Sequence, residues 1–503
     1  MSDNRQIRAK KNIITSIASQ VLVILCGIIV PRLMIGAFGS EAYGAAASIT
    51  QFLSYIALLE GGVGGVARAV LYKPLANRDT ETIGNIMGEI KSFFRVVAFI
   101  FAGYVLLLSF GFKYISRLES MDYVTSIVLV IVISISTFGQ YFIGISNSIL
   151  LQAAQKSYIN SVVSIGATVI NAVVTVILIN FNCSLITEKL ISSCIFFMRP
   201  VVLWLCVRKN YQFKAKVNKA KKYLTQKWTG LSQHIAFFLH SNTDVVVLTL
   251  LADLRTVAVY SVYNMIISHI QNLATSFVSG MEALFGDMLV RDEKENLKKT
   301  FGSYENILSI VSVILFSATI ILIVPFIKIY TQGINDTNYI QFCFAVIMSI
   351  ASLCYCLRLP YHAMVIAAGH FKQTSYAAYG EAIINICLSV LLVHKFGLIG
   401  VSAATLAATL FRFVYYAVYL SKNIINRKVK VFLKRFLINA VTLLINCFMG
   451  NFVISCFNIN DYLSWAICGA VSVTMISVFT YIVNLFFYRE DSVQLVRKFL
   501  KGK

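Results

Sequence analysis

The stretch GATVINAVVTVILI at residues 166–179 recurs as GEAIINICLSVLLV at residues 380–393, and this recurrence decides the fold. Gly166 aligns with Gly380 and Asn171 with Asn385, and nearly all other aligned pairs are apolar. An ordered series of matches such as this predicts that a six-helix membrane unit is present twice. Further pairs follow in the same order: Tyr43 with Tyr260, Lys156 with Lys372, Arg199 with Arg412, Lys209 with Lys422, and Asn210 with Asn423.

The duplication predicts how the chain is organised. An even number of spans per copy gives both copies the same membrane orientation, so a pseudo-two-fold axis along the membrane normal should relate them, with a substrate path between them. The expected fold class is an all-α polytopic membrane protein with about 14 transmembrane helices. The expected parts are an N-lobe at 1–207, a basic linker at 208–228, a C-lobe at 229–421, and a final helix pair with a basic tail at 422–503.

Composition supports a membrane protein. Of the 503 residues, 58% are hydrophobic and 13% are charged, whereas a soluble protein carries about a quarter charged residues. The first apolar stretch follows a basic segment, as in a signal peptide, but it is too long for one and is expected to remain as an anchor. The eleven cysteines are scattered without metal-ligand spacing, so we expect no disulfide framework, no metal and no cofactor.

Lysine and arginine are distributed unequally between the two sides of the predicted topology. With both termini in the cytoplasm, 33 of the 44 basic residues fall in cytoplasmic segments and six in outer loops. This bias predicts a multi-pass membrane protein with this orientation. It also explains the net charge of +22 by contact with anionic membrane lipids, without any nucleic acid.

Two features of the sequence concern possible partners and the energy source: a basic linker, and the lack of a nucleotide-binding motif. Residues 208–228 contain eight basic residues and no acid, which is typical of a topology signal; a regulatory or partner site is the alternative. The sequence contains no phosphate-binding Gly-x-x-x-x-Gly-Lys loop. If the protein moves a solute uphill, an ion gradient must therefore drive it.

Two arginines in matching positions of the copies are the strongest candidates for substrate binding. Ionisable groups near mid-bilayer cost about 3 kcal/mol, so each is a functional candidate. Arg199 and Arg412 should face one cavity from two sides, where their guanidinium groups suit a diphosphate. The alternative is that each arginine pairs with an acid in its own lobe.

Three further charged residues complete the predicted substrate-binding set. Arg32 and Arg358 lie within predicted spans, although Arg32 is close enough to the outer end for its side chain to reach the headgroups. Glu381 occupies the position of Ala167 in the first copy. Because it breaks the symmetry, we connect Glu381 with substrate choice.

Three residues are candidates for coupling to protons or sodium. His240 and Asp244 stand four residues apart, on one face of a predicted helix, where they could take up and release a proton; a structural hydrogen-bonded pair is the alternative. Glu60 directly precedes the glycine-rich segment 61–65. Such a segment predicts a bend or break beside a charge, as at ion sites of transporters, although glycines also permit close helix packing.

The chain resembles the Wzx-type O-antigen or polysaccharide repeat-unit flippases of the multidrug/oligosaccharidyl-lipid/polysaccharide (MOP) exporter superfamily. The segments that carry this resemblance are PRLMIGAFGSEAYG at 31–44, NTDVVVL at 242–248, AAGHFK at 367–372 and FGLIGV at 396–401. The resemblance implies a transporter that flips undecaprenyl-diphosphate-linked oligosaccharide from the cytoplasmic to the periplasmic leaflet by alternating access. It also implies contact with a polysaccharide polymerase and a chain-length regulator.

Other functions remain open at this point. The terminal helix pair departs from the twelve spans of many such flippases and resembles the lipid II flippases, which carry a fourteenth span. A multidrug exporter of the same superfamily would need an acid-lined cavity, and the arginines within the spans argue against it. A polysaccharide polymerase or glycosyltransferase should need catalytic groups on a sizeable outer loop, so we expect that the protein is not an enzyme.

Overall fold

The computed structural model describes residues 2–60, 63–211, 231–276 and 281–488. These residues form helices and short connections, with no strand among them. Helices are expected because, in hydrocarbon, each backbone polar group must find its partner within the segment. The chain divides into two compact units, the first comprising residues 1–238 and 253–258 and the second residues 239–252 and 259–503.

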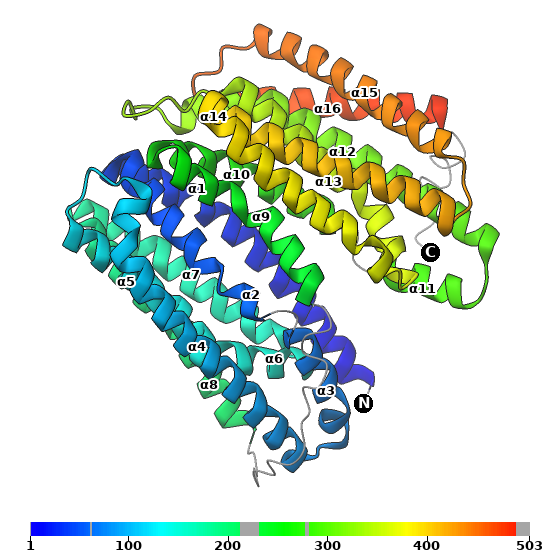
Figure 1. The fold of residues 1–503 in the computed structure, drawn as a ribbon. Coiled ribbons are helices and arrows are strands. Elements are labelled where there is room, and N and C mark those ends of the chain that lie inside the picture. The colour runs from blue at the N-terminus through cyan, green and yellow to red at the C-terminus, as the bar shows by residue number, and fades with distance from the viewer. Residues whose placement is uncertain (1, 61–62, 212–230, 277–280, 489–503) are drawn as a thin grey trace. The chain divides into compact units, whose positions relative to one another are not determined.

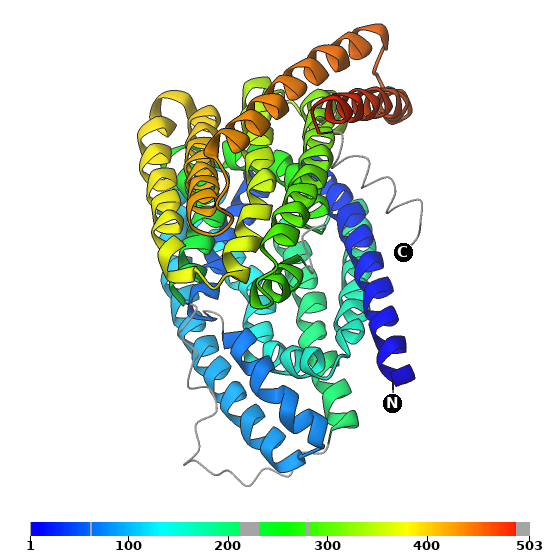
Figure 2. The same cartoon turned by 90° about the vertical axis from the view of Figure 1, so that its right-hand side faces the viewer.

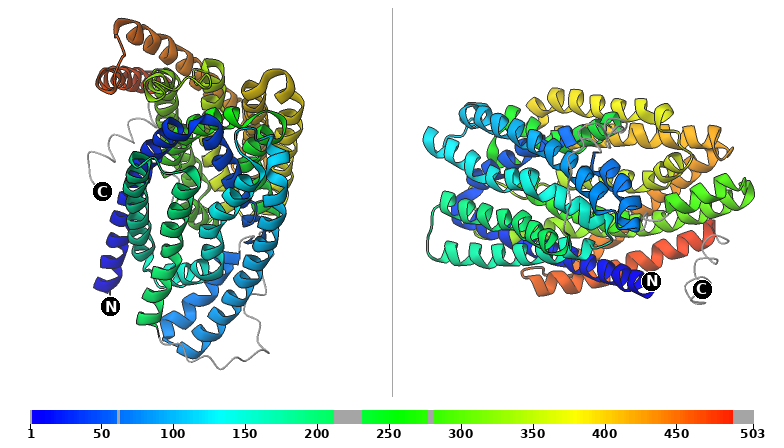
Figure 3. Two further views of the ribbon diagram at one scale, coloured as in Figure 1. Left: turned by 90° about the vertical axis from the view of Figure 1, so that its left-hand side faces the viewer. Right: turned by 90° about the horizontal axis from the view of Figure 1, so that it is seen from below.

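The first unit is a bundle of mostly antiparallel helices. Its helices are α1 (Ser2–Ser54), α2 (Ala57–Glu60), α3 (Val63–Asn77), α4 (Thr80–Ser116), α5 (Tyr123–Gly139), the π-helix η1 (Gln140–Gly144), α6 (Ile145–Ala153), α7 (Ser157–Asn180) and α8 (Leu185–Asn210). Helix α5 packs between α4 and α8, and α7 packs against α1 and α8, as Figures 1 and 3 show. Their core is rich in aromatic side chains, including Phe94, Phe101 and Phe112.

The second unit contains the remaining helices. They are most of α9 (Leu231–Leu251) and α10 (Leu254–Ser276), followed by α11 (Met281–Val290), α12 (Lys294–Tyr330), α13 (Phe342–Ala367), α14 (Phe371–Asn423), α15 (Val429–Cys456) and α16 (Tyr462–Phe487). Helix α13 packs along α14 and α12. The short helix α11 packs against α12 and α13.

Helices α1 and α14 each consist of two helical segments that meet at a glycine with a non-helical backbone. In α1 the kink is at Gly39 (φ 83°, ψ 166°), and in α14 it is at Gly397 (φ 51°, ψ −125°). Both have positive φ, which glycine adopts without the steric cost of a side chain. Each helix therefore contributes two membrane spans without an intervening loop.

The number of spans agrees with the prediction. Ten helical segments are long and apolar enough to cross a membrane, and two of them, Ile14–Glu60 and Gln373–Asn423, each hold the two spans of a kinked helix. Helices α9 and α10, of 21 and 23 residues, complete fourteen. The prediction of an all-helical, multi-pass membrane protein with about 14 helices is confirmed.

The glycine-rich segment after Glu60 is only partly described. Helix α2 ends at Glu60 and α3 begins at Val63, while Gly61 and Gly62 lie outside the described residues. A turn at residues 55–56 separates α1 from α2. The turn therefore interrupts the helix before Glu60, and the bend predicted at the glycines stays a prediction.

The terminal helix pair packs on α12. In Figure 2, α15 and α16 (orange to red) lie beside each other, and both contact α12. Asn446 of α15 donates hydrogen bonds to Ser317 Oγ of α12 (3.1 Å) and to Thr480 Oγ1 of α16 (3.0 Å). A Cβ added at Gly450 would lie 2.2 Å from Ile321 Cδ1, so the absence of a side chain there allows α15 to approach α12 closely.

Side-chain caps define several helix ends outside the membrane. Asp79 caps α4 and accepts a hydrogen bond from Thr82 N (2.9 Å), and bonds from the Thr82 side chain and backbone hold the pKa of Asp79 below its usual value. Asp461 and Ser464 form a capping box at the start of α16. Such caps satisfy the free N–H groups of a first helical turn.

Candidate functional site

The second unit contains a buried cluster of two arginines around one glutamate. Arg358 of α13 and Arg412 of α14 each donate through Nη1 to a different carboxylate oxygen of Glu381, both at 2.5 Å. The Glu381 side chain is fully buried, and the two arginines are nearly so. Three of the predicted substrate-binding residues therefore lie together, and Arg412 pairs with an acid in its own unit.

Aromatic rings surround the two guanidinium groups. The Arg358 guanidinium lies 4.8 Å from the centre of the Tyr355 ring and that of Arg412 lies 5.1 Å from Tyr416. Arg412 also donates to the Tyr416 hydroxyl at 3.0 Å, and the His362 ring stacks on Tyr416 with 5.9 Å between ring centres. Two cations face one carboxylate, so the three ionised groups sum to +1 in a buried site. Within the part of the chain that the structure describes, the buried Nε atoms of both arginines have no hydrogen-bond partner.

Arg199 in the first unit has a different environment. It is half-buried in α8, and its guanidinium lies 5.9 Å from the centre of the Phe196 ring. Within the described ranges it makes no hydrogen bond or ion pair. The alignment of the copies explains the contrast with Arg412, because Glu381 corresponds to Ala167 and the first unit has no acid at that position.

The backbone next to Arg199 is irregular. Pro200 follows it inside α8, and proline removes one helical hydrogen bond. The π-helix η1 packs against α8, and a Cβ at Gly139 would lie 2.4 Å from the Phe197 ring. Insertions of this kind in a helix are frequent at functional sites.

Arg32 and Glu60 lie in the first unit and are both half-buried. Arg32 follows Pro31 in α1, and its Nη1 would lie 3.1 Å from a Cβ added at Gly36. Glu60 ends α2, and its Oε1 would lie 3.5 Å from a Cβ added at Gly64. Each of these two side chains therefore lies beside a glycine four residues later in the chain.

Asp244 in the second unit is the centre of a buried polar network. Its Oδ2 accepts hydrogen bonds from Tyr260 and Thr405, both at 2.9 Å, and its Oδ1 accepts from Asn385 at 3.5 Å. No lysine, arginine or histidine in the described part of the chain forms an ion pair with it. The side chain of His240, its predicted partner, lies outside the described residues.

Oxygen atoms close to this network lack partners. Asn385 also donates to Thr405 at 2.9 Å. No described residue donates a hydrogen bond to the buried Oδ1 of Asn385 or pairs with the buried Oγ of Ser389, one turn further along α14. A carboxylate that is buried among neutral donors, near free oxygen ligands, suits a proton or a small hard cation. The ion-coupling role of Asp244 stays a prediction.

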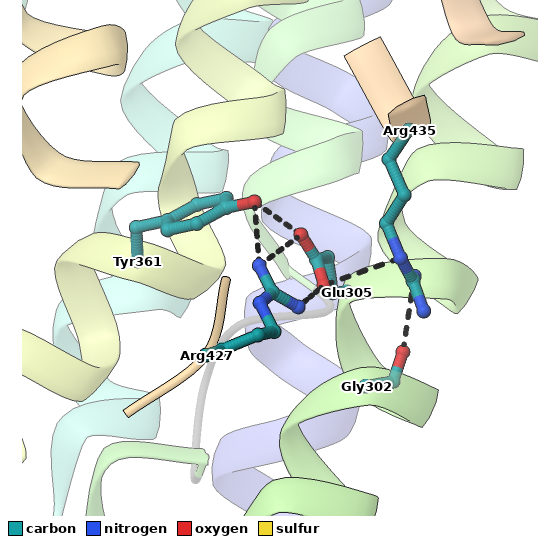
Figure 4. Close-up of polar contacts among 5 residues, drawn as sticks. All are labelled: Gly302, Glu305, Tyr361, Arg427 and Arg435. Atoms are coloured by element: carbon teal, nitrogen blue, oxygen red, sulfur yellow. Dashed lines mark hydrogen bonds and ion pairs between the residues drawn. The ribbon is translucent and has the colours of Figure 1, made fainter. Parts of the chain in front are cut away.

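A second Arg–Glu–Arg cluster, which the sequence did not point to, holds α15 against α12 and α13 (Figure 4). Arg427, in the connection before α15, donates to both carboxylate oxygens of Glu305 at 2.6 and 3.2 Å. Arg435 of α15 lies 3.5 Å from Glu305 and donates to the Gly302 carbonyl. Tyr361 donates to Glu305 as well.

This second cluster is structural in character. Both oxygens of Glu305 are occupied, and three helices meet at it. Burial alone would lower the pKa of Arg427, but its hydrogen bond and charge interaction with Glu305 raise that pKa overall. Glu305 carried a sequence signal, because it is an acid inside an apolar stretch, whereas the arginines were indistinguishable from their basic neighbours.

Neither the protein-family models nor the curated proteins gave a match to this sequence. Solved structures do match. One is the lipid II flippase MurJ in an inward closed conformation, with a TM-score of 0.72, 14% identity, and coverage of 95% of this chain and 99% of that chain.

Transporters of the MATE family match over a smaller share of the chain. An inward-facing multidrug resistance MATE transporter of the MOP superfamily has a TM-score of 0.61 at 14% identity, covering 81% of this chain and 98% of its own. The MATE multidrug transporter DinF-BH has a TM-score of 0.54 at 16% identity, covering 82% of this chain and 95% of its own. This membrane protein therefore has the fold that MurJ shares with the MATE transporters of the MOP superfamily.

Proposed function

We propose that this protein is a flippase that moves undecaprenyl-diphosphate-linked oligosaccharide across the bacterial inner membrane, from the cytoplasmic to the periplasmic leaflet. Its fold neighbours are a flippase and drug transporters, which supports transport rather than catalysis. The observation that carries the substrate class is Arg199, a half-buried intramembrane arginine with no ion pair in the part of the chain that the structure describes. Such a cation needs an anion from elsewhere.

Diphosphate is the anion that fits best. Guanidinium binds phosphate oxygens in pairs, and the Arg358–Glu381–Arg412 cluster adds a second site of net positive charge. An inside-negative membrane potential would favour outward movement of an anion by about 2.3 kcal/mol per charge per 100 mV. Arg32 would contribute further positive charge along the path.

A reconstituted flipping assay tests the arginines. In proteoliposomes with a fluorescent undecaprenyl-diphosphate oligosaccharide, Arg199→Ala with Arg412→Ala should slow flipping by about 100-fold or more, since each of the two lost charged hydrogen bonds contributes about 1.5–3 kcal/mol. Arg68→Ala is the matched control, because Arg68 is held by neutral Gln152 at 2.6 Å. Unchanged flipping by the double variant would remove the diphosphate role.

Asp244 is the proposed coupling site for protons or sodium. An imposed proton or sodium gradient should stimulate flipping by the wild type. In Asp244→Asn the stimulation should be about tenfold smaller, because tenfold is a usual size for the coupling between two sites. Basal flipping without a gradient should change little, because the diphosphate site is intact. A variant that still responds fully to the gradient would exclude this role, and Glu60→Gln would then be the next candidate.

A lipid II-type flippase is the second candidate, and one observation favours it. MurJ matches 95% of the chain, whereas the two MATE structures match 81% and 82%. Supplying lipid II and a repeat-unit lipid to the same proteoliposomes distinguishes the two substrates. Disrupting the gene in its host separates both from a polymerase, because loss of a flippase traps lipid-linked units in the inner leaflet. Contact with a polymerase and a chain-length regulator is proposed only for the repeat-unit flippase.

A further inference from the structure

Both arginines of the Arg358–Glu381–Arg412 cluster have N–H donors that do not contact Glu381. Each guanidinium gives Glu381 only one nitrogen, Nη1, and Arg412 uses Nη2 for Tyr416. Each Nε is buried without a hydrogen-bond partner among the described residues. A guanidinium group has five N–H donors in a fork that matches a two-oxygen anion. A larger anion with more oxygens would therefore satisfy donors that the single carboxylate leaves free.

The positive charge of the two arginines is also only partly neutralised. One carboxylate faces two guanidinium groups, and no other acid in the described residues forms an ion pair with either arginine. A diphosphate carries more negative charge than a carboxylate and would neutralise the pair more fully. Glu381 thus occupies a site whose charge and N–H donors suit a diphosphate.

The first unit shows that an arginine at this position does not require a resident acid. Arg199 corresponds to Arg412, and Ala167 corresponds to Glu381. The half-buried Arg199 has no carboxylate partner among the described residues, while Arg412 is buried with one. The acid is therefore an addition specific to the second unit.

We infer that Glu381 is an internal counter-ion, which occupies the Arg358–Arg412 pair in the empty carrier and is displaced when a diphosphate binds there. This inference rests on the proposed function and deepens it. Glu381 and Arg412 lie on the two arms of α14, on either side of the kink at Gly397. Displacing the carboxylate would remove an ion pair that ties these arms together, so binding and a change in the kink would be coupled.

The test measures the affinity of the purified, full-length protein for inorganic pyrophosphate by calorimetry, at constant ionic strength and with sulfate as the reference anion. Glu381→Gln removes the competing charge with little change in shape. Its Kd for pyrophosphate should be about tenfold lower than that of the wild type, equivalent to about 1.4 kcal/mol. Adding Arg358→Gln to this variant should abolish the gain.

Glu305→Gln is the matched control, because Glu305 is also buried between two arginines but both of its oxygens are held by Arg427, Arg435 and Tyr361. The same gain in this control would overturn the inference, as would equal Kd values for wild type and Glu381→Gln. If Glu381→Gln does not fold, Glu381→Asp keeps the charge on a shorter side chain. This variant should bind pyrophosphate more tightly than the wild type, and an unchanged Kd would overturn the inference.

A short prenyl diphosphate, used in parallel, separates the two sources of this ligand. Tighter binding of the prenyl compound indicates a lipid-linked diphosphate, and equal binding indicates a free diphosphate anion, which would overturn the link to the lipid substrate. A different result would contradict the proposed function itself: proteoliposomes with the wild-type protein would not flip the oligosaccharide lipid. The pyrophosphate titration requires no lipid-linked sugar.

Discussion

Replacing Glu381 by alanine is expected to destabilise the protein by about 3 to 5 kcal/mol, the usual cost of removing one partner from a buried ion pair. The change leaves Arg358 and Arg412 facing each other in a buried site without a counter-ion. Thermal or denaturant unfolding of the detergent-solubilised protein measures the loss. Glu381→Gln should cost less, because its amide oxygen can still accept a hydrogen bond from one arginine.

Two controls make this prediction specific. Asp287→Ala removes an acid from an exposed pair, in which Arg291 Nε lies 3.0 Å from the carboxylate, and should cost less than about 1 kcal/mol. Replacing Arg358, Glu381 and Arg412 together by apolar residues of similar volume should recover most of the lost stability. If Glu381→Ala costs no more than Asp287→Ala, the cluster is not the buried charge network that the distances indicate.

Replacing Gly44 by alanine is expected to destabilise the first unit by about 3 kcal/mol, at the upper end of the usual cost of overpacking. An added Cβ would lie 1.8 Å from the carbonyl oxygen of Leu254 and 2.8 Å from its carbonyl carbon. Because the obstacle is backbone, rotation of a side chain cannot relieve the clash. Helix α1 and the beginning of α10 would have to separate, and unfolding measurements on the purified variant would report the loss.

Gly88 and Gly103 of α4 provide the control for Gly44. Both are exposed, and an added Cβ would meet nothing within 4 Å at either position. Alanine should therefore stabilise the helix there by up to about 1 kcal/mol, because it has the higher helix propensity. A Gly44→Ala variant as stable as Gly88→Ala would show that α1 and α10 do not approach as closely as the structure indicates.

Much of the candidate site could be identified from the sequence, but its pairings could not. Arg199, Arg358, Glu381, Arg412 and Asp244 all stand out as charges in apolar stretches. Which charged residues neutralise one another depends on contacts between positions far apart in the chain. The separations are 23 residues for Arg358–Glu381, 31 for Arg412–Glu381, and 122 for the Arg427–Glu305 pair of the second cluster. Hydropathy has no information on such contacts, because it records how apolar a span is and not which side its charged residue faces.

The missed residues have a related explanation. Arg427 and Arg435 belong to a basic stretch that orients the protein in the membrane, and this general role conceals their specific contact with Glu305. The kinks in α1 and α14 were not predicted either, because Gly39 and Gly397 resemble ordinary loop glycines in the sequence. Their positive φ values in the structure show where one helical segment ends and the next begins.

The sequence by itself determined the all-helical membrane fold and its fourteen spans. It could do so because the bilayer requires each span to satisfy its own backbone hydrogen bonds, which leaves a local pattern in the chain. The tertiary structure alone decided that Arg412 has a resident counter-ion, whereas its counterpart Arg199 has no ion pair among the described residues. The reason is that an ion pair in a low-dielectric interior depends on distance and burial, and both arise only when helices far apart in sequence pack together.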